Sequence, residues 1–250
     1  MEKGYLLKPA VDRTLVVIKK YLKTIQALPV ERMLVVATSA VRCAKNRKDF
    51  LEMSKSQTNV QIQVLSGQEE ALFGYLGVLS SLPVNPKEVV VMDVGGGSTE
   101  FTWQKGGRIS SRSINVGAVR ATEGRYPEDQ IRRLLKPVLD EINEISPAGL
   151  VGTGGTATTL AAMALRLPVY NPVLTHGYII KYAQIADIFS LLSATPLEKR
   201  QQLPGLQPER ADIIIAGGQI ILLVLAGLGI DSLLVSEADL MYGLALKLSK

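Results

Sequence analysis

The chain has 250 residues, 47% of them hydrophobic and 20% charged, a composition typical of a globular protein with one large or two ordinary domains. A single cysteine and a single histidine exclude an internal disulfide and a Cys-rich metal site, and leave almost nothing for zinc or Ser-His-Asp chemistry. The net charge of +5 favours an acidic partner, either a phosphorylated substrate or a nucleic acid. Only 5% of residues are aromatic and no basic run is interleaved with them, which argues against stacking platforms for single-stranded nucleic acid.

The first 65 residues predict two rounds of helix and strand. Apolar spacing predicts a helix over residues 9–28, a strand over 32–37, a helix through Lys55 and a strand over 59–65. In this pattern Arg42 and Asn46 share one face near the start of the second helix. Arg42 there is either a phosphate contact beside the positive end of the helix or an ordinary solvated arginine.

The segment Ser66 to Glu70 is typical of a helix start, and the helix is predicted to run to about Ser80. Ser66 and Glu69 have the spacing of a capping box, which leaves Glu70 without a structural role of that kind. Glu70 either complements the helix dipole or is a catalytic carboxylate at a strand-to-helix junction. Two prolines in residues 82–87 predict a domain boundary, giving domains 1–82 and 83–250, with the last helix able to pack back on the first domain.

The stretch VVVMDVGGGSTE, residues 89–100, predicts a short buried strand that ends at Asp93 and a glycine-rich turn. We expect the glycines to take positive φ and to turn successive N–H groups toward a phosphate, with hydroxyl groups adding donors. Asp93 would hold a divalent cation such as Mg²⁺ beside that phosphate. The alternative is a plain glycine-rich hairpin between two core strands. The phosphate-binding residues predicted from this loop are Gly95, Gly96, Gly97, Ser98 and Thr99.

A second loop of the same kind follows later in the chain. Strands over 101–103 and 108–116 are predicted to join at Lys105-Gly106-Gly107, and a helix over 128–145 contains Pro137 as an expected kink. GLVGTGGTATTL, residues 149–160, then repeats the order of apolar strand, glycine turn and helix. Gly154, Gly155 and Thr156 could bind a second phosphate of one extended substrate if strands of one sheet present both loops.

Residues 213–230 form an uncharged stretch long enough to be a membrane-span candidate. Gln219 near its middle and the pair Gly217-Gly218 favour a buried core helix instead. A strand near 233–236 and a helix over 239–248 complete the chain. Strands that alternate with helices predict an α/β fold with no membrane segment, and the absence of an opening secretory signal predicts a cytoplasmic protein.

Six ordered segments together resemble the exopolyphosphatase and guanosine pentaphosphate phosphohydrolase family. They are ATSAVRCAKNRKDF, IQVLSGQEEALFGYLGV, VVVMDVGGGSTEF, SINVGAVRATE, GTGGTATTLAAM and PERADIIIAGG. The resemblance implies an α/β fold with two ribonuclease-H-like domains, as in actin, sugar kinases and Hsp70, and an active site between them. It also implies a substrate that is polyphosphate or guanosine pentaphosphate, Mg²⁺ as cofactor, and a homodimer as an assembly to consider.

The resemblance also implies roles for single residues. Glu70 matches a general base, and Asp93 and Glu100 match acidic residues around Mg²⁺ and the attacking water. Arg42 matches a contact to the polyanion, and Gly117 and Arg120 match a further motif near the cleft. The implied reaction is in-line phosphoryl transfer to water, in which positioning and charge neutralisation carry most of the catalysis.

Two departures from the family pattern are visible. The family normally begins with a strand and a first phosphate loop that residues 1–10 do not contain, so we expect an incomplete first domain, open strand edges and an inactive or poorly stable chain. In SEADLMYGL, Glu237 and Tyr242 stand where the family tends to have aspartate and arginine. Two alternatives to a phosphohydrolase stay open. The first is an inactive fragment or a protein that binds polyphosphate or alarmone without cleaving it. The second is an actin-like ATPase or sugar kinase, which would also explain the fold and both glycine loops.

Overall fold

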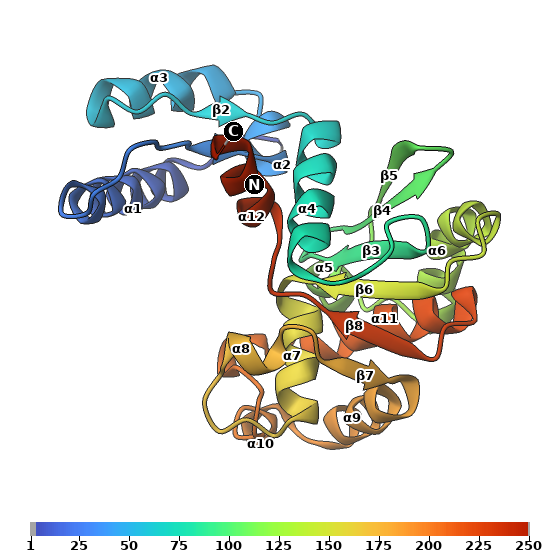
Figure 1. Cartoon of the computed structure of the whole chain (residues 1–250). Coiled ribbons are helices and arrows are strands. Elements are labelled where there is room, and N and C mark those ends of the chain that lie inside the picture. Colours follow the sequence, from blue (N-terminus) through green and yellow to red (C-terminus); the bar gives the residue numbers. More distant parts are fainter. Residues whose placement is uncertain (1–3, 250) are drawn as a thin grey trace. The chain divides into compact units, whose positions relative to one another are not determined.

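The computed structural model describes residues 4–249, in which helices and strands alternate along the chain (Figure 1). The chain divides into two compact units, residues 4–70 with 244–249 and residues 71–243. We call them unit 1 and unit 2. This division falls inside a helix, after Glu70, and the domain boundary after residue 82 stays a prediction.

Unit 1 contains α1 (Lys8–Gln26), α2 (Ser39–Arg42) and α3 (Arg47–Thr58), with the parallel strands β1 (Val36–Ala37) and β2 (Gln63–Val64). The buried side chains of Val11 and Leu15 on α1 pack with Phe50 of α3. Both predicted strands shrink to two residues, because only Val36 and Ala37 find pairing partners in β2.

The helix predicted to run through Lys55 is interrupted, and the shared face of Arg42 and Asn46 was a wrong prediction. Arg42 ends α2, whereas Asn46 precedes the first residue of α3. The amide of Asn46 accepts a hydrogen bond from the Leu6 N–H at 2.9 Å and donates one to the Leu6 carbonyl at 3.0 Å. These two hydrogen bonds keep Asn46 in the non-helical connection between α2 and α3. Helical spacing alone could not reveal them, because Leu6 is 40 residues away.

Helix α4 (Gly67–Ser81) begins with the predicted capping box. The Glu69 carboxylate accepts from the Ser66 N–H at 2.8 Å, and the Ser66 hydroxyl accepts from the Glu69 N–H at 3.1 Å. The Ser66 N–H, and then the Ser66 hydroxyl group, lower the pKa of the Glu69 carboxyl group by hydrogen bonding to it. Glu69 is therefore occupied by the helix start, as expected.

Unit 2 is built on one six-stranded mixed sheet with the order β5-β4-β3-β6-β8-β7. Its strands are β3 (Val89–Val94), β4 (Thr99–Lys105), β5 (Arg108–Ile114), β6 (Gly149–Thr153), β7 (Ile179–Lys181) and β8 (Ser232–Val235). Strands β3, β6 and β8 are parallel neighbours, and the other pairings are antiparallel. Gly106 and Gly107 have positive φ in the predicted turn between β4 and β5. The three-residue edge strand β7 was not predicted, because such a short strand leaves too little alternation to recognise.

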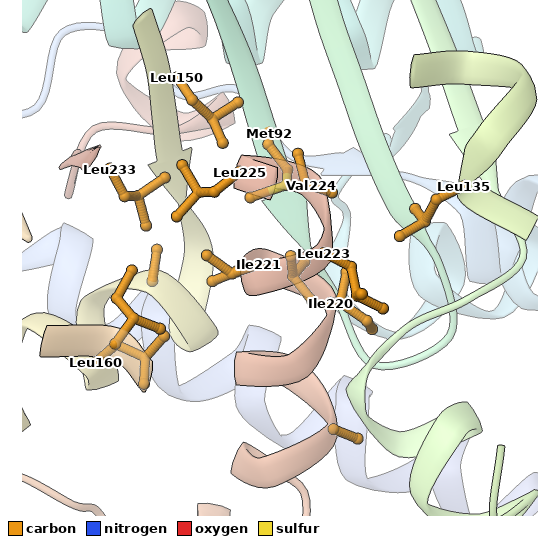
Figure 2. Packing of buried hydrophobic residues seen from close by; sticks show 14 of the residues in the cluster. Met92, Leu135, Leu150, Leu160, Ile220, Ile221, Leu223, Val224, Leu225 and Leu233 are labelled. Atoms are coloured by element: carbon orange, nitrogen blue, oxygen red, sulfur yellow. The ribbon is translucent and has the colours of Figure 1, made fainter. Parts of the chain in front are cut away.

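The core of unit 2 forms around α11 (Ile214–Leu228), as Figure 2 shows. Side chains of this helix meet residues of the sheet and of neighbouring helices, namely Met92, Leu135, Leu150, Leu160 and Leu233. The uncharged stretch is thus a core helix of 15 residues. Among residues 4–249, no helix has both the length and the apolarity that crossing a membrane would require.

The remaining helices connect or cover the strands. They are α5 (Ala118–Glu123), α6 (Glu128–Asn143), α7 (Gly154–Ala164), α8 (Pro172–Thr175), α9 (Tyr182–Ala194), α10 (Leu197–Arg200), the 3₁₀ helix η1 (Pro208–Arg210) and α12 (Leu240–Leu248). Pro137 lies inside α6. The α/β class predicted from the alternating pattern is confirmed.

Candidate active site

The first glycine loop, residues 95–98, joins β3 to β4 and is closed by a 3.0 Å hydrogen bond from the Gly95 N–H to the Ser98 carbonyl. The expected positive φ was wrong, because none of Gly95, Gly96 and Gly97 has it. Close approach explains the glycines instead. A Cβ would lie 3.2 Å from the Ser98 carbonyl oxygen at Gly95 and 3.2 Å from the Val119 side chain at Gly96.

Helix α5 holds this loop through the loop carbonyls. The N–H groups of Ala118 and Arg120 donate to the Gly95 and Gly96 carbonyls at 2.9 Å, and Arg120 Nε donates to the Gly97 carbonyl at 2.7 Å. The N–H groups of Gly96, Gly97 and Ser98 have no acceptor within residues 4–249. Three successive free donors are the arrangement that an anion requires.

Three predicted residues have structural contacts at this loop. Gly117 precedes α5 and touches the loop backbone so closely that a Cβ would lie 2.6 Å from the Gly95 carbonyl oxygen. Arg120 anchors Gly97, as described above. The Thr99 hydroxyl is fully buried and donates to the Val116 carbonyl at 2.6 Å, so it faces the interior.

Asp93 and Glu100 are directly opposite each other in the antiparallel pair of β3 and β4. Directly opposed side chains point to the same face of a sheet and lie about 5 Å apart at Cβ. Ser113, the partner of Glu100 on β5, donates its hydroxyl to Glu100 Oε1 at 2.8 Å. The sheet therefore places two carboxylates side by side, at the strand end next to the first glycine loop.

The second glycine loop lies at the same edge of the sheet. Asp93 on β3 is level with Thr153 on the parallel neighbour β6, and α7 begins at the next residue, Gly154. Gly154 has a φ of +76°, and a Cβ there would lie 2.2 Å from Asp93 Oδ1. Neighbouring strands of one sheet therefore present both loops, which is the condition set for binding two phosphates of one substrate.

Arg210 is a candidate that reasoning from single residues missed. Its guanidinium lies over Gly155, where a Cβ would be 2.1 Å from Arg210 Nη1, and its Nε donates to Gln207 Oε1 at 2.9 Å. A cation thus lies at the start of α7, the end of a helix where anions bind. The segment PERAD was visible as part of a motif, but no local feature connects residue 210 with residue 155. The Thr156 hydroxyl, predicted as a phosphate contact, donates to the Val94 carbonyl at 3.0 Å.

The candidate residues of unit 1 are joined by an ion pair. Arg42 Nη1 lies 2.8 Å from Glu70 Oε2 and also donates to the Leu65 carbonyl at 2.8 Å. Both charged side chains are partly buried, with 27% and 32% of their surface exposed. The pair fixes the direction of the Glu70 carboxylate beside the start of α4. The prediction that Arg42 is an ordinary solvated arginine is thereby disfavoured.

Glu237 follows β8 and is engaged by its surroundings. Its Oε1 accepts hydrogen bonds from the hydroxyls of Tyr170 and Thr175, and its N–H donates to His176 Nδ1 at 3.1 Å. Burial, and then the hydrogen bond to Glu237, raise the pKa of Tyr170. Glu237 therefore supports the end of β8 in this structure.

Within residues 4–249, no group of three or more His, Cys, Asp or Glu side chains could hold a metal ion. The pair Asp93 and Glu100 suits an ion of the Mg²⁺ type, which keeps several waters and takes one or two carboxylates together with substrate phosphate oxygens.

Several known proteins resemble the whole chain. It is 31% identical to exopolyphosphatase 2 of Mycobacterium tuberculosis over 98% of its own length and 84% of that protein. It is also 32% identical to a bifunctional 3-dehydroquinate synthase/phosphatase of Fusobacterium nucleatum, covering 97% of this chain but only 39% of that protein.

Solved structures agree with this relationship. A Ppx/GppA family member from Aquifex aeolicus has a TM-score of 0.84 at 33% identity, covering 99% of this chain and 84% of that one. An exopolyphosphatase from Cytophaga hutchinsonii has a TM-score of 0.86 at 25% identity, covering 98% and 84%. The fold is therefore the two-domain, actin-like fold that the resemblance implied. The model of the Ppx/GppA phosphatase family matches residues 1–250, and the chain belongs to that family.

Proposed function

We propose that the protein releases the terminal phosphate of inorganic polyphosphate, or of guanosine pentaphosphate, by in-line attack of water. The observation that carries the proposal is the edge of the unit 2 sheet, where two glycine loops and two opposed carboxylates adjoin on neighbouring strands. Both substrates end in a phosphoanhydride, whose hydrolysis needs charge neutralisation and a positioned water more than covalent chemistry.

The loops supply the positions for two successive phosphates. The free N–H groups of Gly96, Gly97 and Ser98 would bind the oxygens of the terminal phosphate. The first turn of α7, with the Arg210 guanidinium over Gly155, would bind the phosphate that leaves. Charge that develops on the leaving oxygen would thus meet a helix N-terminus and a cation.

The carboxylates divide the remaining work. Asp93 and Glu100 would hold Mg²⁺, which neutralises phosphate charge when it is bound. Glu70 would accept the proton of the attacking water, and Arg42 would keep the Glu70 carboxylate aimed. Ser113 would hold one oxygen of Glu100, so that the other oxygen stays available.

The decisive experiment compares two neighbouring glutamates. Glu70→Gln should lower kcat for phosphate release from polyphosphate about 100- to 10,000-fold, because the proton acceptor is lost. Glu69→Gln is the matched control, since glutamine also completes a capping box and should leave both activity and stability near the wild-type values. Activity of both proteins is measured with polyphosphate and with guanosine pentaphosphate, with and without Mg²⁺.

This experiment and two further measurements on the wild type, polyphosphate binding and ATP turnover with a sugar, separate the remaining readings. Equal activity of Glu70→Gln and Glu69→Gln would remove Glu70 from the mechanism. Tight polyphosphate binding with no phosphate release from the wild type would favour a binding protein. Formation of ADP from ATP in the presence of a sugar would favour the kinase reading.

A further inference from the structure

Positive charge is distributed very unequally between the two units. In the sequence, residues 1–70 with 244–250 carry 14 Lys and Arg against 7 Asp and Glu, whereas residues 71–243 carry 14 against 16. The whole positive excess of the chain therefore lies in unit 1. A concentration of cations of this kind attracts polyanions over distances of a Debye length, about 10 Å at 0.1 M salt.

A short segment of unit 1 concentrates this charge next to the candidate base. Arg42, Lys45, Arg47 and Lys48 lie within seven residues, from the end of α2 to the first turn of α3. Arg47 Nη1 donates to the Arg42 carbonyl at 3.3 Å, so the Arg47 guanidinium is close to the residue that binds Glu70. The cations thus continue outward from the Arg42 and Glu70 pair.

The outer three cations of this segment are available for a ligand. Lys45, Arg47 and Lys48 are exposed, and none of them has a carboxylate partner in the described part of the chain. Lys45 Nζ lies 5.4 Å from the centre of the Tyr5 ring, which adds a weak cation–π attraction. We call Lys45, Arg47 and Lys48 the outer cations.

The backbone that carries the outer cations is firmly held. The Lys45 N–H donates to the Gly4 carbonyl at 2.9 Å, and both ends of the Asn46 amide bond the backbone of Leu6. Phe50, one turn further along α3, is 5% exposed and packs against Val11 and Leu15 of α1. Cations on a held backbone lose less conformational freedom on binding than those on a mobile loop.

We propose that the outer cations bind phosphates of a long linear polyphosphate beyond those held at the catalytic residues, and so favour long chains over short ones. This inference rests on the proposed function. Its physical basis is counterion release, because each phosphate that a Lys or Arg neutralises frees a condensed cation. A long polyphosphate repeats its charge along a flexible chain and can bind several cations at once, whereas tripolyphosphate offers only three phosphates.

The test removes the three charges together. The triple variant Lys45→Gln, Arg47→Gln and Lys48→Gln is compared with the wild type and with a control triple variant, Arg13→Gln, Lys20→Gln and Lys23→Gln. The control loses the same charge from exposed positions of α1 in the same unit. Phosphate release is measured with polyphosphate of several hundred residues and with tripolyphosphate, across a range of salt concentrations.

The outer-cation variant should lose about 10- to 100-fold in kcat/KM for the long substrate, and less than about 2-fold for tripolyphosphate. The slope of log kcat/KM against log salt is negative for the long substrate, and its magnitude should fall by about 2 in the outer-cation variant. Each of the three lost phosphate contacts contributes about 0.7, the value for a single-stranded polyanion. The control variant should show neither change. An equal loss with both substrates, or an equal loss in the control, would overturn the proposal.

Binding separates this inference from the proposed function. The dissociation constant for fluorescently labelled long polyphosphate does not depend on turnover, and it should rise about 10- to 100-fold in the outer-cation variant alone. If the wild type releases no phosphate but this difference in binding is present, the proposed function is wrong, whereas binding of polyphosphate by the outer cations is supported. If binding is unchanged in the outer-cation variant, the inference fails whether or not the protein is an enzyme.

Discussion

Gly117→Ala should damage the first phosphate loop by sterics alone. Gly117 is extended, with φ −149° and ψ 170°, a conformation that alanine adopts without strain. Its added Cβ, however, would lie 2.6 Å from the Gly95 carbonyl oxygen, 2.6 Å from the Ser98 nitrogen and 2.7 Å from the Gly96 carbonyl oxygen. All three are backbone atoms, so no flexible side chain can move aside.

The expected cost follows from these contacts. The loop and α5 must separate by about 0.8 Å before the methyl group reaches ordinary van der Waals distance. Overpacking of this kind costs about 1–3 kcal/mol. The hydrogen bonds from Ala118 and Arg120 to the loop carbonyls also weaken, each worth about 1 kcal/mol. We expect a total destabilisation of about 2–4 kcal/mol, and a loss of about 100-fold in kcat because the loop donors are displaced.

Gly74→Ala provides the matched control. Gly74 lies inside α4, and a Cβ there would meet nothing within 4 Å. Alanine should therefore stabilise the helix by about 0.5–1 kcal/mol and leave phosphate release unchanged. Urea unfolding and phosphate release are measured for both variants. A Gly117→Ala protein that unfolds and turns over like the wild type would refute the assignment of Gly117 as a steric determinant of the loop.

Two further substitutions test single hydrogen bonds. Ser113→Ala removes the donor to Glu100 and should lower kcat about 5- to 10-fold with little change in KM. The control is Ser111→Ala, two residues earlier on β5, which should leave kcat unchanged. Equal kcat values for the two variants would contradict the positioning of Glu100 by Ser113. Burial raises the pKa of Tyr75 to about 12, and its hydroxyl donates to the Pro86 carbonyl at 2.8 Å. Because this folded pKa exceeds the unfolded value, the phenol stabilises the protein fully below about pH 10, and the contribution disappears as the pH rises toward 12. Tyr75→Phe should therefore cost about 1 kcal/mol in urea unfolding at neutral pH, and the difference from the wild type should shrink above about pH 10; a constant difference would exclude this titration.

Features defined by short sequence spacing were predictable. The capping box of Ser66 and Glu69, the turn at Gly106 and Gly107 and both glycine loops formed where the residues indicated. Each depends on interactions between residues only a few positions apart, so the local residue types determine it. The family resemblance was likewise visible in the ordered motifs of the chain, and the match to the family model confirms it.

The tertiary structure decided what the loop residues touch. Gly96 needs no positive φ, but it does need room beside Val119, and Gly155 needs room beneath Arg210, which is 55 positions away. These constraints come from long-range packing, and no local pattern encodes them.

The extent of the elements in unit 1 also required the tertiary structure. A strand forms only as far as a partner pairs with it, so the predicted strand over residues 32–37 is reduced to Val36 and Ala37. The break between α2 and α3 depends on the bonds from Asn46 to Leu6, 40 residues earlier. Sequence thus determined the local chemistry of the candidate site, while contacts between distant segments determined which groups stand free to bind phosphate and which are spent in holding the loops.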